Sequence, residues 1–191
     1  MALRPNPPNR SPLMCARSRR LTVTVLFWLV CMGAAEAQAQ SEDQIKAAFL
    51  FTFARYVEWP AKSFAGPDDS VRICMAGSKE FATVVAQTVS GKSVENRPVQ
   101  VDTLSALSES PGCHILYVGE EVASDAAGVA SSVSGASVFT VADRAGFAEQ
   151  GGIANFIRTN NKVRFEINPK AAKRAGLKVS SRLLRLATVV E

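Results

Sequence analysis

The chain has few of the residues that hydrolases and metalloenzymes use for catalysis. Its 191 residues include a single histidine, His114, which lies in an apolar run typical of a buried strand. One histidine in such a run does not supply the general-base arrangements that most hydrolases use. The sequence also has no G-x-S-x-G elbow, no P-loop and no G-x-G-x-x-G motif. We therefore predict that the protein is not an enzyme, with no catalytic residues, no cofactor and no metal ion.

Long hydrophobic runs are absent after residue 39, and the one that precedes it is short. Five arginines come before position 21, a nearly uncharged apolar run covers residues 21–35, and two small-x-small cleavage sites lie within residues 35–39. A run of about 15 residues falls short of the roughly 20 that a membrane-spanning helix needs. We therefore predict that residues 1–39 are a secretory signal peptide and that residues 40–191 form one soluble, exported domain.

Most of the chain after residue 39 has no excess of basic over acidic residues. The formal net charge of the whole sequence is +5, but removing the leader leaves it close to +1, so nucleic-acid binding loses its support. Residues 158–191 hold nine basic and two acidic residues, whereas residues 40–157 hold eight and fourteen. Arg182 and Arg185 lie three positions apart on a predicted helix and can share one face. This region is predicted to meet an acidic partner or an anionic membrane surface, or its charges simply solvate the helices.

Only two cysteines remain in the exported chain, Cys74 and Cys113. Two cysteines in an exported protein indicate one disulfide. A bridge that closes a loop of about 40 residues would stabilise the fold by about 4 kcal/mol in the chain-entropy treatment. The alternative is a metal site that combines both cysteines with His114, for which no fourth ligand has a recognisable spacing.

Strands that alternate with helices predict an α/β fold with three layers: a mostly parallel sheet, helices on both of its faces, and an antiparallel hairpin near the C-terminus. The first helix begins at a capping box over residues 41–44 and ends near residue 58, because Pro60 disfavours helical backbone before it. The other predicted helices cover residues 79–89, 125–133 and 170–175, and the last runs from Ser180 or Ser181 to Ala187. The predicted strands cover residues 71–76, 97–101, 113–118, 136–141, 153–158 and 162–167.

The predicted hairpin and the first predicted helix carry polar residues of interest. Arg164 and Glu166 alternate along one strand, so they lie on the same face, where they can pair with each other or form a polar pocket near Asn155. The alternative is a solvated edge strand protected by charge. Arg55 lies among aromatic residues at helical spacing, which indicates either core packing or a surface that binds a partner.

Four blocks of the sequence carry a resemblance to a known family. The blocks are residues 46–60 (KAAFLFTFARYVEWP), residues 113–118 (CHILYV), residues 151–156 (GGIANF) with 161–168 (NKVRFEIN), and residues 171–187 (AAKRAGLKVSSRLLRLA). With these blocks in order along nearly the whole exported chain, the protein resembles the YfiR family.

The resemblance implies a periplasmic α/β protein that tends to form homodimers. It also implies a partner, the periplasmic sensor region of an inner-membrane diguanylate cyclase, which the repressor binds to lower cyclic di-GMP signalling and biofilm formation. In the family an outer-membrane lipoprotein can sequester the repressor. Cys74 and Cys113 match one disulfide pair of the family, but a second pair has no counterpart, because residues 145–152 contain no cysteine. Redox switching is therefore not implied for this chain.

Two regulatory roles remain open at this point. For a repressor, the candidate partner-binding residues are Arg55, Arg182 and Arg185. The candidate pocket residues are Asn155, Arg164 and Glu166. The alternative role is a periplasmic small-molecule-binding accessory protein of a sensor histidine kinase, which predicts a cavity with convergent polar groups at the carboxyl ends of the strands.

Overall fold

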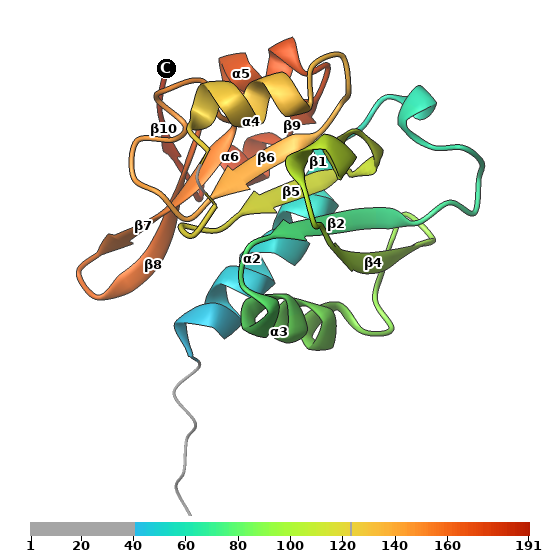
Figure 1. Ribbon diagram of the computed structural model, residues 1–191, viewed down its shortest axis with the longest axis horizontal. Coiled ribbons are helices and arrows are strands. Elements are labelled where there is room, and N and C mark those ends of the chain that lie inside the picture. The colour runs from blue at the N-terminus through green and yellow to red at the C-terminus, as the bar shows by residue number, and fades with distance from the viewer. Residues whose placement is uncertain (1–40, 123) are drawn as a thin grey trace, which may run out of the picture. The chain divides into compact units, whose positions relative to one another are not determined.

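The computed structural model describes residues 41–122 and 124–191, and the predicted signal peptide lies outside them. The strands of the main sheet are β2 (Val71–Ala76), β3 (Ser93–Val94), β4 (Arg97–Thr103), β5 (Ile115–Val118), β6 (Phe139–Ala142), β7 (Ala154–Thr159), β8 (Lys162–Ile167) and β10 (Thr188–Val189). They are arranged in the order β10-β8-β7-β6-β5-β2-β4-β3 (Figure 1). Only the β7–β8 and β3–β4 pairs are antiparallel. The mostly parallel sheet with a C-terminal hairpin confirms the predicted α/β fold.

Helices cover both faces of this sheet, as predicted. Alternate residues of a strand point to opposite faces, so Ile73 of β2 packs in one hydrophobic cluster and the adjacent Cys74 in another. The first cluster includes buried residues of α2 (Glu42–Tyr56) and α3 (Lys79–Val89), and the second includes those of α4 (Ala126–Ser132). Figure 1 shows α2 and α3 on the opposite side of the sheet from α4. No helix in the described ranges is long and apolar enough to cross a membrane.

The first helix, α2, begins and ends close to the predicted positions. Ser41 Oγ accepts a hydrogen bond from the backbone N–H of Gln44 (3.2 Å), and Gln44 Oε1 accepts one from the backbone N–H of Ser41 (3.0 Å). These reciprocal bonds are the predicted capping box. After Tyr56 the chain becomes extended, and β1 (Val57–Glu58) pairs with β9 (Lys178–Val179) in a separate two-stranded sheet.

The β7–β8 hairpin closes through a two-residue loop. Asn160 and Asn161 both have positive φ, 51° and 58°, which is the geometry of a type I′ turn and suits asparagine. The hairpin leads into α5 (Pro169–Arg174), whose N-cap is the predicted one: Asn168 Oδ1 accepts a hydrogen bond from the backbone N–H of Ala171 (2.9 Å). The sequence signals at both ends of this segment are therefore confirmed.

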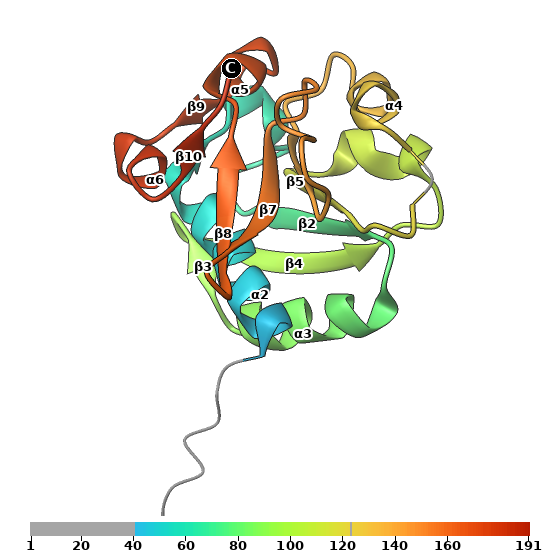
Figure 2. The same cartoon turned by 90° about the vertical axis from the view of Figure 1, so that its left-hand side faces the viewer.

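The end of the chain corrects one prediction. The last helix, α6 (Ser181–Leu184), is a single turn, so the predicted helix as far as Ala187 is wrong at its C-terminal end. The chain continues instead as β10, the edge strand beside β8, where the Val190 N–H donates to the carbonyl of Ile167 (2.9 Å). The β-branched residues 188–190 favour extended backbone, and pairing with β8 satisfies their backbone groups. Figure 2 shows β10 and α6 at this end of the sheet.

The predicted disulfide joins Cys74 in β2 to Cys113, just before β5, with a Cα–Cα distance of 5.8 Å. It links two neighbouring strands on the face of the sheet that α4 covers. Because both sulfur atoms belong to this bond, the alternative metal site with His114 has no thiolate ligand to offer.

Candidate functional site

The C-terminal segment presents an exposed surface that combines apolar and basic side chains. We call Arg182, Arg185, Leu186 and Val189 the C-terminal basic surface. Leu186 and Val189 are 58% and 51% exposed, and they are the large apolar side chains that stand out to solvent in the described residues. Neither arginine forms an ion pair within the described part of the chain.

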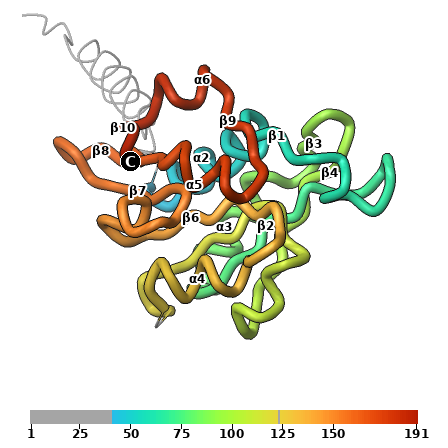
Figure 3. The backbone as a smooth tube through the Cα atoms, turned by 90° about the horizontal axis from the view of Figure 1, so that it is seen from above, coloured from blue at the N-terminus to red at the C-terminus, as the bar shows by residue number. Residues whose placement is uncertain are grey.

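The local fold of α6 explains why these side chains are exposed. Ser180 caps the helix, with its Oγ accepting a hydrogen bond from the Arg182 N–H (3.2 Å). Leu183 is fully buried in the cluster that includes α2. In a one-turn helix anchored by this single leucine, Arg182 and Arg185 on either side of it remain exposed. Figure 3 shows the stretch from α5 through α6 to β10 on the other side of the molecule from α4.

Arg55, the third candidate for partner binding, is far from this surface along the chain, but the end of its helix lies beside the start of α6. It is exposed in the last turn of α2, and its guanidinium lies 6.0 Å from the ring of Phe51 and 5.7 Å from that of Tyr56. The Tyr56 carbonyl accepts a hydrogen bond from the backbone N–H of Ser180 (2.9 Å). The end of α2 and the start of α6 are therefore adjacent, and all three candidate arginines belong to neighbouring elements.

The three pocket candidates separate into a hydrogen-bonded pair, Asn155 and Glu166, and an exposed residue, Arg164. Asn155 is fully buried, with its Oδ1 accepting from the Ala148 N–H (3.0 Å) and its Nδ2 donating to Glu166 Oε2 (3.0 Å). Arg164 lies opposite Ile157 in the hairpin and is exposed, with no ion pair to Glu166. Through these hydrogen bonds Asn155 connects the segment before β7 to Glu166 in the hairpin. None of the three residues lines either of the two larger cavities of the domain.

A charged cluster that sequence reasoning missed lies at the carboxyl ends of β5 and β6. The side chain of Lys46 is only 11% exposed, and its Nζ lies 2.8 Å from Glu42 Oε1 and 2.5 Å from Asp143 Oδ2. Glu42 also accepts from Arg158 Nη2 at 2.9 Å, and the Tyr117 hydroxyl lies 3.4 Å from Asp143 Oδ2. The i,i+4 spacing of Glu42 and Lys46 was the only signal in the sequence, since Asp143 is far away along the chain.

The titration behaviour of this cluster follows from its hydrogen bonds. Burial lowers the pKa of Lys46, but the hydrogen bonds to Asp143 and Glu42 outweigh burial, so the pKa lies above its ordinary value. The hydrogen bond from Lys46 holds the pKa of Glu42 below its ordinary value. Burial, assisted by the charge of Asp143, raises the pKa of Tyr117. Lys46 and Glu42 are therefore charged at neutral pH, and the Tyr117 hydroxyl stays protonated.

A cavity of about 530 Å³ opens beside this cluster. Its lining residues are Glu42, Lys46, Glu120, Asp143, Ala145, Phe156, Ile157 and Arg158. The position at the carboxyl ends of parallel strands is where ligands of doubly wound folds bind. The polar groups converge on it, but four of the five charged side chains already pair with one another.

His114 is a core residue rather than part of a reactive site. It is 3% exposed, its Nδ1 accepts a hydrogen bond from the Arg72 N–H (3.1 Å), and its ring stacks on Phe64 at a centroid distance of 4.4 Å. Its Nε2 has no hydrogen-bond partner, and burial lowers its pKa. Over the residues that the structure describes, no group of three histidine, cysteine, aspartate or glutamate side chains could hold a metal ion.

Comparisons with known proteins agree with this fold. A family model described as YfiR/HmsC-like matches residues 43–188. The crystal structure of a conserved domain protein from Vibrio cholerae O1 biovar El Tor str. N16961 superposes with a TM-score of 0.56 at 12% identity, covering 79% of this chain and 60% of that one. An ABC domain from Streptococcus pneumonia, solved in complex with L-Trp, gives a TM-score of 0.44 at 15% identity, covering 68% of this chain and 59% of that one. At such identity the first similarity supports the fold alone, and the chain spans about three fifths of the length of both structures.

Proposed function

Because the chain belongs to the YfiR/HmsC-like family, as the resemblance in its sequence predicted, we propose that it represses an inner-membrane diguanylate cyclase from the periplasm. Membership of the family supports a periplasmic regulatory role in general. The observation that carries the specific proposal is the C-terminal basic surface, where exposed apolar side chains adjoin arginines that have no ion pair in the described residues. Binding there to the sensor region of the cyclase lowers cyclic di-GMP signalling and biofilm formation.

The chemistry of this surface suits an acidic partner that also offers an apolar contact. Exposed apolar patches bordered by polar residues mark interaction sites, and arginine is enriched at the centre of protein interfaces. Complementary charge speeds encounter and excludes basic competitors. The acidic balance of residues 40–157 keeps the rest of the domain from competing for the same partner.

Repression requires only that the protein bind the inactive state of the cyclase more tightly than the active state. Changing a population from 99% active to 99% inactive needs about 5.5 kcal/mol of differential affinity. Fully burying a leucine or valine side chain contributes about 1.5 to 3 kcal/mol. Leu186 and Val189 therefore provide a free energy of this size only where the inactive state of the cyclase buries them and the active state leaves them exposed.

The test is cellular cyclic di-GMP in a strain from which the gene has been deleted. We expect the concentration to rise on deletion, to return to its original value with the exported protein, and to stay high with a form that lacks residues 1–39. An unchanged concentration on deletion would refute repression of a diguanylate cyclase.

The cavity of about 530 Å³ at the carboxyl ends of the strands supports a second candidate function. A periplasmic accessory protein of a sensor histidine kinase would use such a cavity, beside Lys46 and Asp143, to bind a small molecule. This role predicts unchanged cyclic di-GMP on deletion and altered phosphorylation of a kinase. Measuring both quantities in the same deletion strain separates the two functions.

A further inference from the structure

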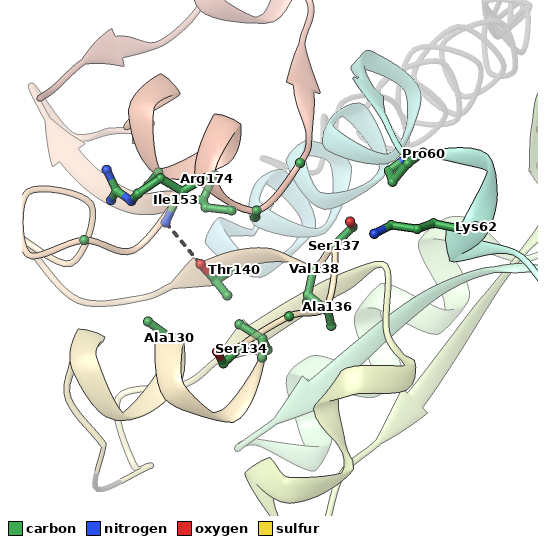
Figure 4. A pocket seen from close by; sticks show the side chains of 16 residues that line it. Pro60, Lys62, Ala130, Ser134, Ala136, Ser137, Val138, Thr140, Ile153 and Arg174 are labelled. Atoms are coloured by element: carbon green, nitrogen blue, oxygen red, sulfur yellow. Dashed lines mark hydrogen bonds between the residues drawn. The ribbon is translucent and has the colours of Figure 1, made fainter.

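A second cavity, of about 440 Å³, lies at the opposite edge of the sheet, near the start of β6. It is formed by the end of α4, the loop that leads into β6, the end of α5, and residues 60–62 (Figure 4). Its apolar lining includes Val133, Ile153 and Ala171, all of which are largely buried. A volume of this size is typical of sites for small organic ligands.

The charges of this amino-edge groove are all of one sign. Lys62 and Arg174 are its charged lining residues, and no carboxylate lines it. Neither of the two forms an ion pair within the described ranges. In Figure 4 the side chain of Lys62 points across the opening toward the hydroxyl of Ser137, and Arg174 lies at the other end. An unneutralised ammonium group beside a hydroxyl suits an anion.

A smaller cavity of about 240 Å³ continues the groove beyond Lys62. The two cavities share Lys62 and residues 135–137, and Ser63 lines the smaller one. Lys62 is the only charged residue lining the smaller cavity. The lysine therefore stands where the two cavities meet, with apolar surface on one side and hydroxyl groups close by.

We propose that the amino-edge groove binds a small amphipathic anion. The carboxylate or phosphate group of the ligand lies between Lys62 and the hydroxyls of Ser63 and Ser137. The apolar part of the ligand covers Val133 and Ile153 in the larger cavity and extends toward Arg174. At the carboxyl edge Lys46 is already neutralised by Asp143, whereas the amino-edge groove keeps its positive charge available.

Such a ligand would connect elements that are distant in sequence. The end of α4, the end of α5 and residues 60–62 all line the groove, so a bound molecule contacts all three and stabilises the folded domain. The inference concerns a ligand site of this chain and holds whichever partner the C-terminal basic surface binds.

Octanoate is the probe for the test, with octanol, octylammonium and octyl phosphate as comparisons. Three glycines that line the groove, Gly135, Gly151 and Gly176, give backbone amide signals in a distinct region of the ¹H–¹⁵N correlation spectrum. In the exported protein we expect octanoate or octyl phosphate to shift these three signals and to bind about fivefold more tightly than octanol. The tighter of the two anions identifies the headgroup as a carboxylate or a phosphate ester.

Three variants locate the binding. Lys62→Gln is expected to weaken octanoate binding about fivefold and to leave octanol binding unchanged. Lys79→Gln, which removes one exposed charge from α3, is expected to change neither. Ala130→Trp fills the groove from the exposed side of α4 without removing a charge, and is expected to abolish the shifts while the remaining signals keep their positions.

Several results would overturn the proposal. Octanol or octylammonium binding as tightly as octanoate would show that the positive charge does not select the ligand. Equal losses in Lys62→Gln and Lys79→Gln would show that only the net charge of the protein matters. An absence of shifts at the solubility limit of both anions would show that the groove does not bind them.

Discussion

Positive side chains are neutralised by carboxylates at the carboxyl edge of the sheet and are unpaired at the amino edge. At the carboxyl edge, Lys46 is nearly buried and bonds to Glu42 and Asp143. At the amino edge, Lys62 and Arg174 line a groove without any carboxylate. The C-terminal basic surface resembles the amino edge, because its arginines have no ion pair in the described residues. Charges that are paired hold the domain together, and charges that are exposed and unpaired remain available to other molecules.

Burial explains why the two kinds of charge have different consequences. Removing one partner of a buried ion pair leaves the other charge uncompensated in a medium of low polarity, which is costly. Removing an exposed charge changes the free energy of unfolding very little, because water solvates it well. Substitutions in the paired regions should therefore alter stability, and substitutions at the exposed arginines should alter binding.

The largest effect on stability is expected at the disulfide between Cys74 and Cys113. Cys74→Ser removes a bond that closes a loop with a sequence separation of 39 residues. We expect it to lower the free energy of unfolding by about 4 kcal/mol, measured by urea titration of the oxidised protein. Reduction of the wild-type protein should produce a similar loss, and an unchanged urea midpoint in the variant would refute the stabilising role of the bond.

The next largest effect is expected at the carboxyl-edge cluster. Lys46→Met leaves Asp143, whose side chain is 23% exposed, without its closest cation. We expect a loss of about 2 kcal/mol in the free energy of unfolding. The double variant Lys46→Met with Asp143→Asn should recover most of it, because no charge is then left uncompensated. Lys79→Met on the surface of α3 is the control, and a loss of equal size there would contradict the comparison.

The buried histidine is expected to make stability depend on pH. Burial lowers the pKa of His114 in the folded state, so below its ordinary value near 6.5 the unfolded chain binds more protons than the folded chain. The contribution of His114 to the free energy of unfolding should be constant above about pH 6.5 and fall as the pH drops toward the folded pKa, by at most about 1.4 kcal/mol per pH unit.

His114 is the only histidine in the chain, so its ring signals in NMR report this pKa without ambiguity. Because the Arg72 N–H donates to Nδ1, the neutral ring should carry its proton on Nε2. Trp59 lies 5.8 Å from the His114 ring and its Nε1 donates to the His114 carbonyl (3.2 Å), so its fluorescence should change over the same pH range. Titration of the ring at or above pH 6.5 would contradict this account.

The smallest effect on stability is expected at the C-terminal basic surface. Leu186→Ser with Val189→Ser replaces two exposed side chains, and the free energy of unfolding should change by less than about 0.5 kcal/mol. Repression of the cyclase should nevertheless weaken, because the apolar part of the contact is lost. A variant that represses as well as the wild type would remove these side chains from the proposed interface, and a markedly destabilised one would contradict the small effect on stability.

Local signals in the sequence were enough to predict most of the fold. Helix α3 coincides with the predicted residues 79–89, because Ser78 accepts the N-cap hydrogen bond from the Phe81 N–H (3.1 Å) and the apolar residues recur at helical spacing. The two cysteines that follow residue 39 led to the correct disulfide. The helix depends on residues that are close in sequence, and two cysteines can form only one disulfide with each other.

Features that depend on distant residues were missed. Lys46 and Asp143 lie 97 positions apart, so neither composition nor periodicity could reveal their ion pair. Lys62 and Arg174 are likewise far apart in the sequence, and only the tertiary fold brings them to the same groove. Strand β10 was missed, and the helix before it was predicted to extend too far, because the pairing with β8 that favours extended backbone is a tertiary contact.

The most direct test of the account is complementation of the deletion strain with charge-reversed proteins, using cellular cyclic di-GMP as the readout. The variant Arg182→Glu with Arg185→Glu inverts the C-terminal basic surface, and Lys79→Glu with Lys162→Glu makes the same change in net charge at exposed sites elsewhere. We predict that the control lowers cyclic di-GMP as well as the wild type does, and that the arginine variant, exported and folded, does not. Full repression by the arginine variant would contradict the claim that these unpaired arginines bind the partner.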